Sequence, residues 1–234
     1  IDSPDGRGGH ATIRVYGQSL GGGPVRAIGS AETGNSGNPI DLANVVDGDT
    51  TGDLWLRQAA TAWDAGSITR STIFKETTSA SLQLHSSARV IEGGGDGSAE
   101  ARGINHTGNL TVTSFAEGGD GAIDPAGDGG AGIANASGEL YGDGGVLVVE
   151  ARATGGQGQL LSNLCPCPAT PSGAATATAS GTAHGGAIVD VLAEPRRAGV
   201  ADWPPSIGRS SSVAFGSNNG GSAVSVTARA TGTD

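Results

Sequence analysis

Residues 144–158 read Gly-Gly-Val-Leu-Val-Val-Glu-Ala-Arg-Ala-Thr-Gly-Gly-Gln-Gly. Every second residue from Leu147 to Ala153 is apolar, whereas the alternate positions from Glu150 to Thr154 are polar. A period of 2 is typical of a half-buried strand and not of a helix. The flanking glycines predict tight turns, in which φ is often positive. Because the inward residues are small, we expect this strand to pack closely on another layer.

The same pattern of glycines and alternating small residues recurs along the chain, with new repeats near Gly97, Gly130, Gly173 and Gly221. Irregular spacing of constant strands indicates loops of variable length on a constant scaffold. The pattern predicts an all-β fold, a Gly-rich β-solenoid-like stack of short strands with long loops. A Gly-rich β-sandwich also fits. The solenoid is favoured because two sheets ~10 Å apart normally need larger inward residues, and aromatic residues are only 3% of this chain.

We expect residues 1–234 to form a single all-β domain. Residues 32–53, rich in Asn, Asp and Gly, read as a long loop. The segment 54–91 is atypical, because it holds two of the three tryptophans and few glycines. A short helix could start at Asp53. Strands are the alternative for this segment, and two are expected at Ile68–Thr78 and Ser81–Ile91. The Gly-rich repeats occupy residues 8–36, 93–158 and 171–231.

The chain carries a net charge of −10, and its only lysine is Lys75. An acidic, lysine-poor surface is a poor match for nucleic acid or an anionic membrane. No apolar run approaches the ~20 residues of a membrane span. The chain has no methionine and begins at Ile1. We therefore expect a protein that is secreted, with its leader removed, and that acts outside the cell or on its surface.

The last repeat copies the opening stretch, with Val-Thr-Ala-Arg-Ala-Thr-Gly at 226–232 against Val-Glu-Ala-Arg-Ala-Thr-Gly at 149–155. No capping unit is evident at either end, and bare strand edges template further pairing. We therefore expect copies of the chain to pair head to tail into an open filament. The residues expected to mediate assembly are Ala11, Ile13, Val15, Val224, Val226, Ala228 and Ala230.

Three weaker patterns concern disulfides, calcium and glycosylation. Cys165 and Cys167 could bridge locally or between molecules. Asp47, Asp49 and Asp53 resemble a calcium loop, since hard oxygen ligands at alternate positions suit Ca²⁺; beyond this possible calcium we expect no cofactor. Three sequons, each Asn-x-Ser/Thr, are candidates for glycosylation. They begin at Asn105, Asn109 and Asn135.

The Gly-Gly/(Ala/Val/Thr)-x-Ala-x-Ala/Gly-Gly cadence of residues 93–158 and 171–231 resembles the Gly/Ala/Thr-rich repeats of secreted bacterial surface and adhesin-like β-solenoid proteins. The resemblance is compositional, implies an extracellular structural or adhesive role and carries over no functional residues. The sequence thus favours a secreted, non-enzymatic subunit of an extracellular filament. The alternatives are a carbohydrate-active β-helix enzyme near Trp55 and Trp63, and a monomeric adhesin module of a surface protein.

Overall fold

The protein is described by a computed structural model that covers residues 13–34, 38–63, 66, 68–121, 127–158, 170–197 and 208–229. Fifteen strands and no helix occur in these ranges. One sheet has seven strands, β2 (Val25–Thr33), β5 (Asp53–Ala62), β7 (Ser81–Val90), β9 (Asn109–Glu117), β11 (Val146–Gly155), β13 (Ile188–Arg197) and β15 (Val224–Ala228). A second sheet has six, β3 (Asp41–Ala43), β6 (Thr69–Thr77), β8 (Gly97–Asn105), β10 (Gly132–Leu140), β12 (Ala175–Ala183) and β14 (Ser210–Asn218). A separate pair is formed by β1 (Val15–Ser19) and β4 (Val46–Thr50).

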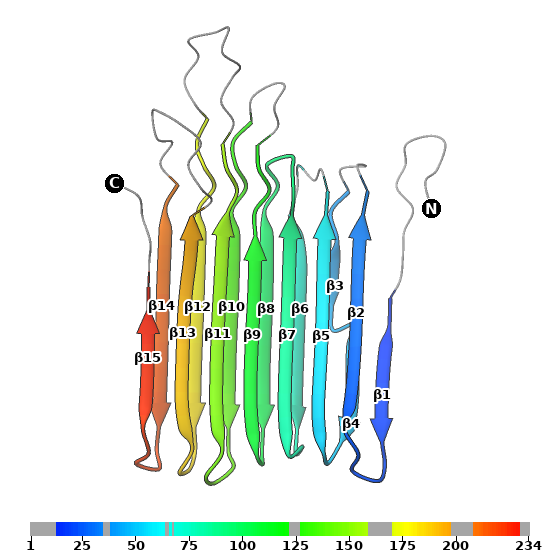
Figure 1. The fold of residues 1–234 in the computed structure, drawn as a ribbon, viewed down its shortest axis with the longest axis vertical. Helices are drawn as coiled ribbons and strands as arrows, with labels where there is room; N and C mark the ends of the chain where they lie inside the picture. The colour runs from blue at the N-terminus through cyan, green and yellow to red at the C-terminus, as the bar shows by residue number, and fades with distance from the viewer. Residues whose placement is uncertain are drawn as a thin grey trace, which may run out of the picture.

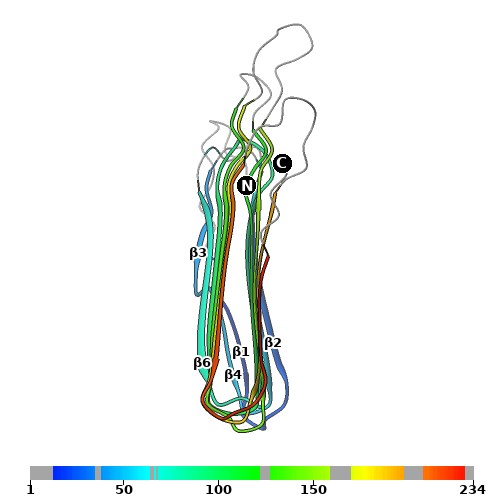
Figure 2. The ribbon, with the colours of Figure 1, turned by 90° about the vertical axis from the view of Figure 1, so that its left-hand side faces the viewer.

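Every strand pairing is parallel, and each coil of the chain contributes one strand to each large sheet (Figure 1). The two sheets face each other, and the chain crosses from one to the other at both ends of its strands (Figure 2). Although the layers are stacked as in a sandwich, the parallel pairing of successive coils is that of a β-solenoid. The predicted all-β solenoid is therefore confirmed in preference to the sandwich.

The register is kept although the coils differ in length. Ser81 pairs with Asn109, 28 residues later, whereas Val146 pairs with Ile188, 42 residues later. The extra residues of the longer coil lie between β11 and β12, and the connections from β9 to β10 and from β13 to β14 are also longer than that from β7 to β8. Loops of variable length therefore interrupt a constant scaffold, as the irregular repeat spacing predicts.

The core lies between the two sheets and is narrow. The inward residues of β11, from Leu147 to Ala153, are completely buried, as their alternation predicts. On the facing strand β10, the inward residue Gly138 lies opposite the large pair, since a Cβ there would be 2.8 Å from the Leu147 Cδ1 atom and 3.0 Å from the Val149 Cγ2 atom. Large residues on one sheet thus oppose glycine on the other, which lets the sheets approach closely.

The two sheets draw closer together toward the upper end of Figure 2. At this end, glycine backbones of several coils pack directly on one another in a layer. In that layer the amide of Gly130 donates to the Gly119 carbonyl, Gly156 to Gly130 and Gly173 to Gly156, each at 2.8 Å. A Cβ on any of these donor glycines would collide with a backbone carbonyl of another coil. Close backbone contact, more than turn geometry, therefore explains much of the glycine content. The predicted positive φ is found at Gly144 (72°).

One prediction for residues 32–63 is wrong, and one of the two readings left open there is excluded. The expected long loop at 32–53 contains β3 and β4, and the segment after Asp53 is the strand β5, not a helix. Leu54 and Leu56 of β5 continue the buried leucine rows of β7, with which they pair in register. Tertiary stacking thus overrides a local pattern that also fits a helix. The expected strands at Ile68–Thr78 and Ser81–Ile91 are confirmed as β6 and β7.

Candidate functional site

The end of the stack formed by β14 and β15 leaves part of the interior open. Val224 and Val226 pair with Val189 and Val191 of β13, which are completely buried. They occupy the same inward rows, yet they are 42% and 45% exposed. In the described part of the chain, no strand pairs with the outer edge of β14 or β15. This end therefore presents two parallel strand edges (Figure 1), with a row of apolar residues between them.

The outer face of β14 adds large apolar side chains to this end. Val213 is 57% exposed and Phe215 is 60% exposed. They pair with Thr178 and Ser180 of β12, so both rows change from polar to apolar between β12 and β14. Large exposed apolar side chains on an unpaired edge are typical of a contact surface.

The opposite end is formed by β1 and β2, and it repeats the interior pattern of the other coils. Val25 and Ala27 of β2 continue the inward rows of β5 and are buried. Gly17 of β1 faces Val25, because a Cβ there would lie 2.9 Å from the Val25 Cγ1 atom. Tyr16, on the outer side of β1, is 58% exposed, and Leu20, in the turn after β1, is 92% exposed. Within the described ranges, both ends therefore present apolar side chains beside strand edges that pair with no other strand.

A kink separates β1 and β4 from the six-stranded sheet. It lies at Asn44, which has a positive φ of 50° and whose Oδ1 atom accepts a hydrogen bond from the Phe74 amide at 2.7 Å. The completely buried Gln58 side chain joins the strands around the kink, because it accepts from the Val45 amide at 2.9 Å and donates to the carbonyls of Leu42 and Thr72, each at 3.0 Å. The N-terminal coil is thus held by a buried polar group instead of a continuous ladder.

Of the residues expected to mediate assembly, Ile13 and Val15 are half-buried at inward positions of the first coil. Val224, Val226 and Ala228 are exposed at the last coil. Ala11 and Ala230 lie outside the described residues, as do Cys165 and Cys167.

The three aspartates of the predicted calcium site are all exposed. Asp47 and Asp49 share the outer face of β4, and Asp53 opens β5 beyond the turn. The Asp47 carboxylate accepts a hydrogen bond from the Lys75 ammonium at 2.8 Å. In the ranges that the structure covers, no group of three or more His, Cys, Asp or Glu side chains is arranged to hold a metal ion. Calcium binding stays a prediction without support from this arrangement.

The three sequon asparagines differ in accessibility. Asn105 is completely buried, and its side-chain nitrogen donates to the carbonyls of Ser79 (3.0 Å) and Asn109 (2.8 Å). Its amide is therefore not accessible for modification in the folded chain. Asn109 and Asn135 are exposed, so their modification stays a prediction.

A column of stacked rings that no sequence pattern predicted follows the strands of the six-stranded sheet. The Tyr141 ring stacks between His106 (5.0 Å between centroids) and His184 (4.3 Å). His106 also pairs with Glu76 at 2.9 Å. Each ring follows its strand by one residue, so aligning the strands by register would have found the column.

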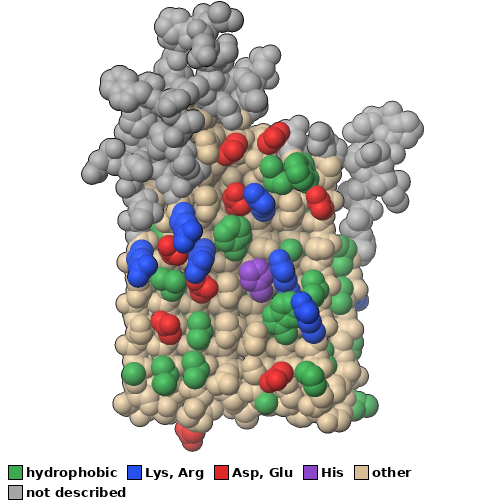
Figure 3. Space-filling model, in the orientation of Figure 1, with side chains coloured by type: hydrophobic (Ala, Val, Ile, Leu, Met, Phe, Trp, Pro, Cys, Tyr) green, Lys and Arg blue, Asp and Glu red, His purple; other side chains and the backbone are tan. Residues whose placement is uncertain are grey.

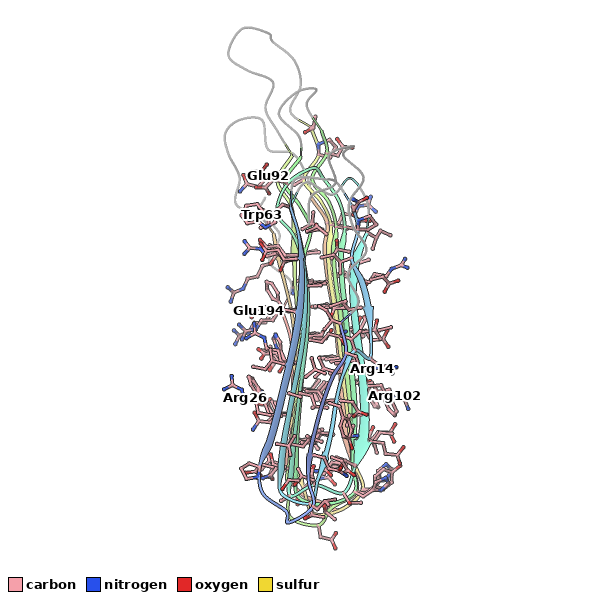
Figure 4. All side chains as sticks on the ribbon, turned by 90° about the vertical axis from the view of Figure 1, so that its right-hand side faces the viewer. Arg14, Arg26, Trp63, Glu92, Arg102 and Glu194 are labelled. Atoms are coloured by element: carbon pink, nitrogen blue, oxygen red, sulfur yellow. The ribbon has the colours of Figure 1, made fainter. Side chains whose placement is uncertain are left out.

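The outer face of the seven-stranded sheet also carries charged side chains, several of them in ion pairs. Figure 4 shows Arg26 and Glu194 projecting from this face and Arg102 from the opposite one. No helix in the described ranges is long and apolar enough to cross a membrane. Comparison with known proteins adds no relative: no family model matches the chain, and no match was found among curated proteins or solved structures.

Proposed function

We propose that the protein is a structural subunit that stacks head to tail into an extracellular filament, with β14 and β15 of one copy pairing with β1 and β2 of the next. The observation that carries this proposal is the half-exposure of Val224 and Val226 in rows that are completely buried one coil earlier. A further coil in the same register would bury both side chains. Completing the burial of each valine would contribute about 1 kcal/mol.

The two ends fit each other in register. Val224 pairs with Val189 within one copy, and it could pair in the same way with Val25 of the next copy. Val226 would then lie beside Ala27 of that copy, and the inward apolar rows of the seven-stranded sheet would continue across the joint. In the six-stranded sheet, the inward glycines form a column of Gly103, Gly138, Gly181 and Gly216. Gly17 and Gly48 occupy the same inward position, so they would extend this column.

The outward residues at this joint are also compatible. With Gly216 beside Gly17, the exposed Phe215 ring lies next to the exposed Tyr16 ring, and aromatic neighbours on paired strands stabilise the pairing. On the other sheet, Ser225 would neighbour Arg26 and Thr227 would neighbour Ile28, so no like charges meet. Because the contact joins two different surfaces, it leaves a free end on each copy and propagates as an open chain.

The proposed location outside the cell has its own support. It comes from the acidic, lysine-poor composition and from the likeness of the repeats to those of secreted bacterial surface proteins. A surface of small residues held by backbone hydrogen bonds suits a structural role, which needs no catalytic group.

Electron microscopy and sedimentation of purified protein test the proposal. We expect rods that lengthen with protein concentration. Val226→Lys should abolish them, because it places a charge in the row that the next copy would bury. Val146→Lys is the matched control, since Val146 is similarly exposed (39%) but lies on the outer face of an internal strand. Wild-type protein that stays monomeric at all concentrations, or a Val226→Lys variant that assembles like wild type, would refute the proposal.

A further inference from the structure

A shallow depression of about 270 Å³ lies on the outer face of the seven-stranded sheet, across β5, β7 and β9. Its polar and aromatic lining forms two rows that follow the register. One row is Trp55, Gln83 and Thr111, and the other is Arg57, His85 and Thr113. The depression is therefore built from three consecutive coils and lies on a face, away from both ends of the stack.

The arginines beside this depression differ from the others on the same face. Farther along the sheet, Arg89 pairs with Glu117 at 2.7 Å, and Arg152 and Arg196 pair with Glu194. Arg57 and Arg26 form no ion pair within the described ranges. Figure 3 shows this face, with acidic and basic side chains mixed on the left and basic side chains near the histidine on the right.

The unpaired guanidinium groups give this region a local positive charge on a protein of net charge −10. The Arg26 guanidinium carbon lies 3.9 Å from the centre of the Trp55 ring, so the indole holds that arginine in place. The Arg57 side chain is exposed and free to bind an anion. Guanidinium groups recognise carboxylates with two parallel hydrogen bonds, which makes Arg57 the expected anchor.

The rest of the lining supplies neutral hydrogen-bonding groups. Gln83 offers an amide, and the two threonines offer hydroxyls. Burial, and after it the neighbouring Arg57, hold the pKa of His85 below its ordinary value of 6.5. The imidazole is therefore neutral at pH 7 and can donate one hydrogen bond and accept another. A ligand that satisfies this set carries an anionic group together with many hydroxyl groups.

We propose that this depression binds an anionic polysaccharide, with Arg57 on a carboxylate or sulfate group and Gln83, Thr111 and Thr113 on sugar hydroxyls. The polysaccharide would run across the strands, along the axis of the stack. Neighbouring strands are ~4.8 Å apart, which is close to the length of one pyranose ring, so successive sugars would meet successive coils. This proposal is independent of assembly, because every residue involved lies on the outer face.

Calorimetry with short, defined oligosaccharides tests the proposal without multivalent binding. The probes are a galacturonic acid hexamer, a sulfated glucose hexamer and an uncharged glucose hexamer. We expect binding of at least one of the two anionic hexamers and none of the uncharged one. The anionic hexamer that binds identifies the charged group that Arg57 contacts.

Two variants make the test specific. Arg57→Gln should weaken binding about tenfold or more, since it removes a charge-assisted contact. Arg152→Gln removes the same charge from a site that is already paired with glutamates, and it should leave binding unchanged. The proposal is overturned if neither anionic hexamer binds, if the two variants behave alike, or if single-stranded DNA of equal charge competes better than the sugars.

Discussion

Gly138 faces Leu147 across the interior, and a Cβ at residue 138 would lie 2.8 Å from the Leu147 Cδ1 atom. The same relationship recurs at Gly103 with Leu110 and at Gly181 with Val191, each at 2.9 Å. The separation of the two sheets is therefore set by a glycine on one side and a branched side chain on the other.

Gly138→Ala should destabilise the protein by about 1–3 kcal/mol, because the added methyl group must push Leu147 and Val149 away in a packed interior. Thermal and urea unfolding measure the change. Gly21→Ala is the matched control, since no atom lies within 4 Å of a Cβ at residue 21 and its φ is not positive. Equal stability of the Gly138→Ala variant and wild type would mean that the sheets lie farther apart than described.

The strands could be predicted from the sequence where the alternation of apolar and polar residues is complete and glycines flank it. In residues 144–158 the alternation alone identifies β11 and its buried face. The glycine layer could not be predicted, because Gly119, Gly130 and Gly156 come together only when coils of different length stack in register. Turn glycines and close-contact glycines look alike in a sequence.

Of the two candidate sites, one could be predicted from the sequence and the other could not. The exposed row at Val224 and Val226 follows from the last repeat being a copy of an internal one. The depression around Arg57 and His85 was not predicted, because its residues lie 28 residues apart in the chain and become neighbours only through pairing of β5 with β7. The sequence gives no sign of that register until the strand at residues 53–62 is distinguished from a helix.

Gln58→Leu should cost about 3 kcal/mol of stability. The substitution keeps the side-chain volume similar but leaves the Val45 amide and the Leu42 carbonyl without their buried partner. Urea unfolding measures the loss, and Gln18→Leu on the exposed side of β1 serves as the control. A Gln58→Leu variant as stable as wild type would show that the kink at Asn44 does not depend on this side chain.

His85 should make stability fall as the pH drops below 6.5. Its pKa is lowered in the folded state by burial and by Arg57, so the unfolded chain binds the proton more readily. The loss begins near the unfolded pKa and ends once the pH is below the folded pKa. Its register neighbours are Arg57 on β5 and Thr113 on β9, so no carboxylate there opposes the shift.

The measurement is the difference between wild type and His85→Gln in unfolding free energy from pH 8 to pH 4. Other titrating groups contribute to both proteins and cancel in the difference. We expect wild type to lose stability relative to the variant as the pH falls through this window. A pH-independent difference would show that the His85 pKa is the same in the folded and unfolded chains.

A cysteine pair tests the register of the proposed joint. In a background with Cys165 and Cys167 changed to Ser, Phe215→Cys and Tyr16→Cys should form a disulfide between copies, because paired parallel strands bring such positions within ~5 Å. Ser211→Cys with Tyr16→Cys is the control, since residue 211 lies four positions along β14, ~13 Å away. Non-reducing electrophoresis should then show a ladder of covalent multimers for the first pair only. Efficient cross-linking of the control pair, with none for the Phe215→Cys pair, would mean that Gly216 does not align with Gly17. The proposal of assembly would then stand, but the proposed register of the joint would be wrong.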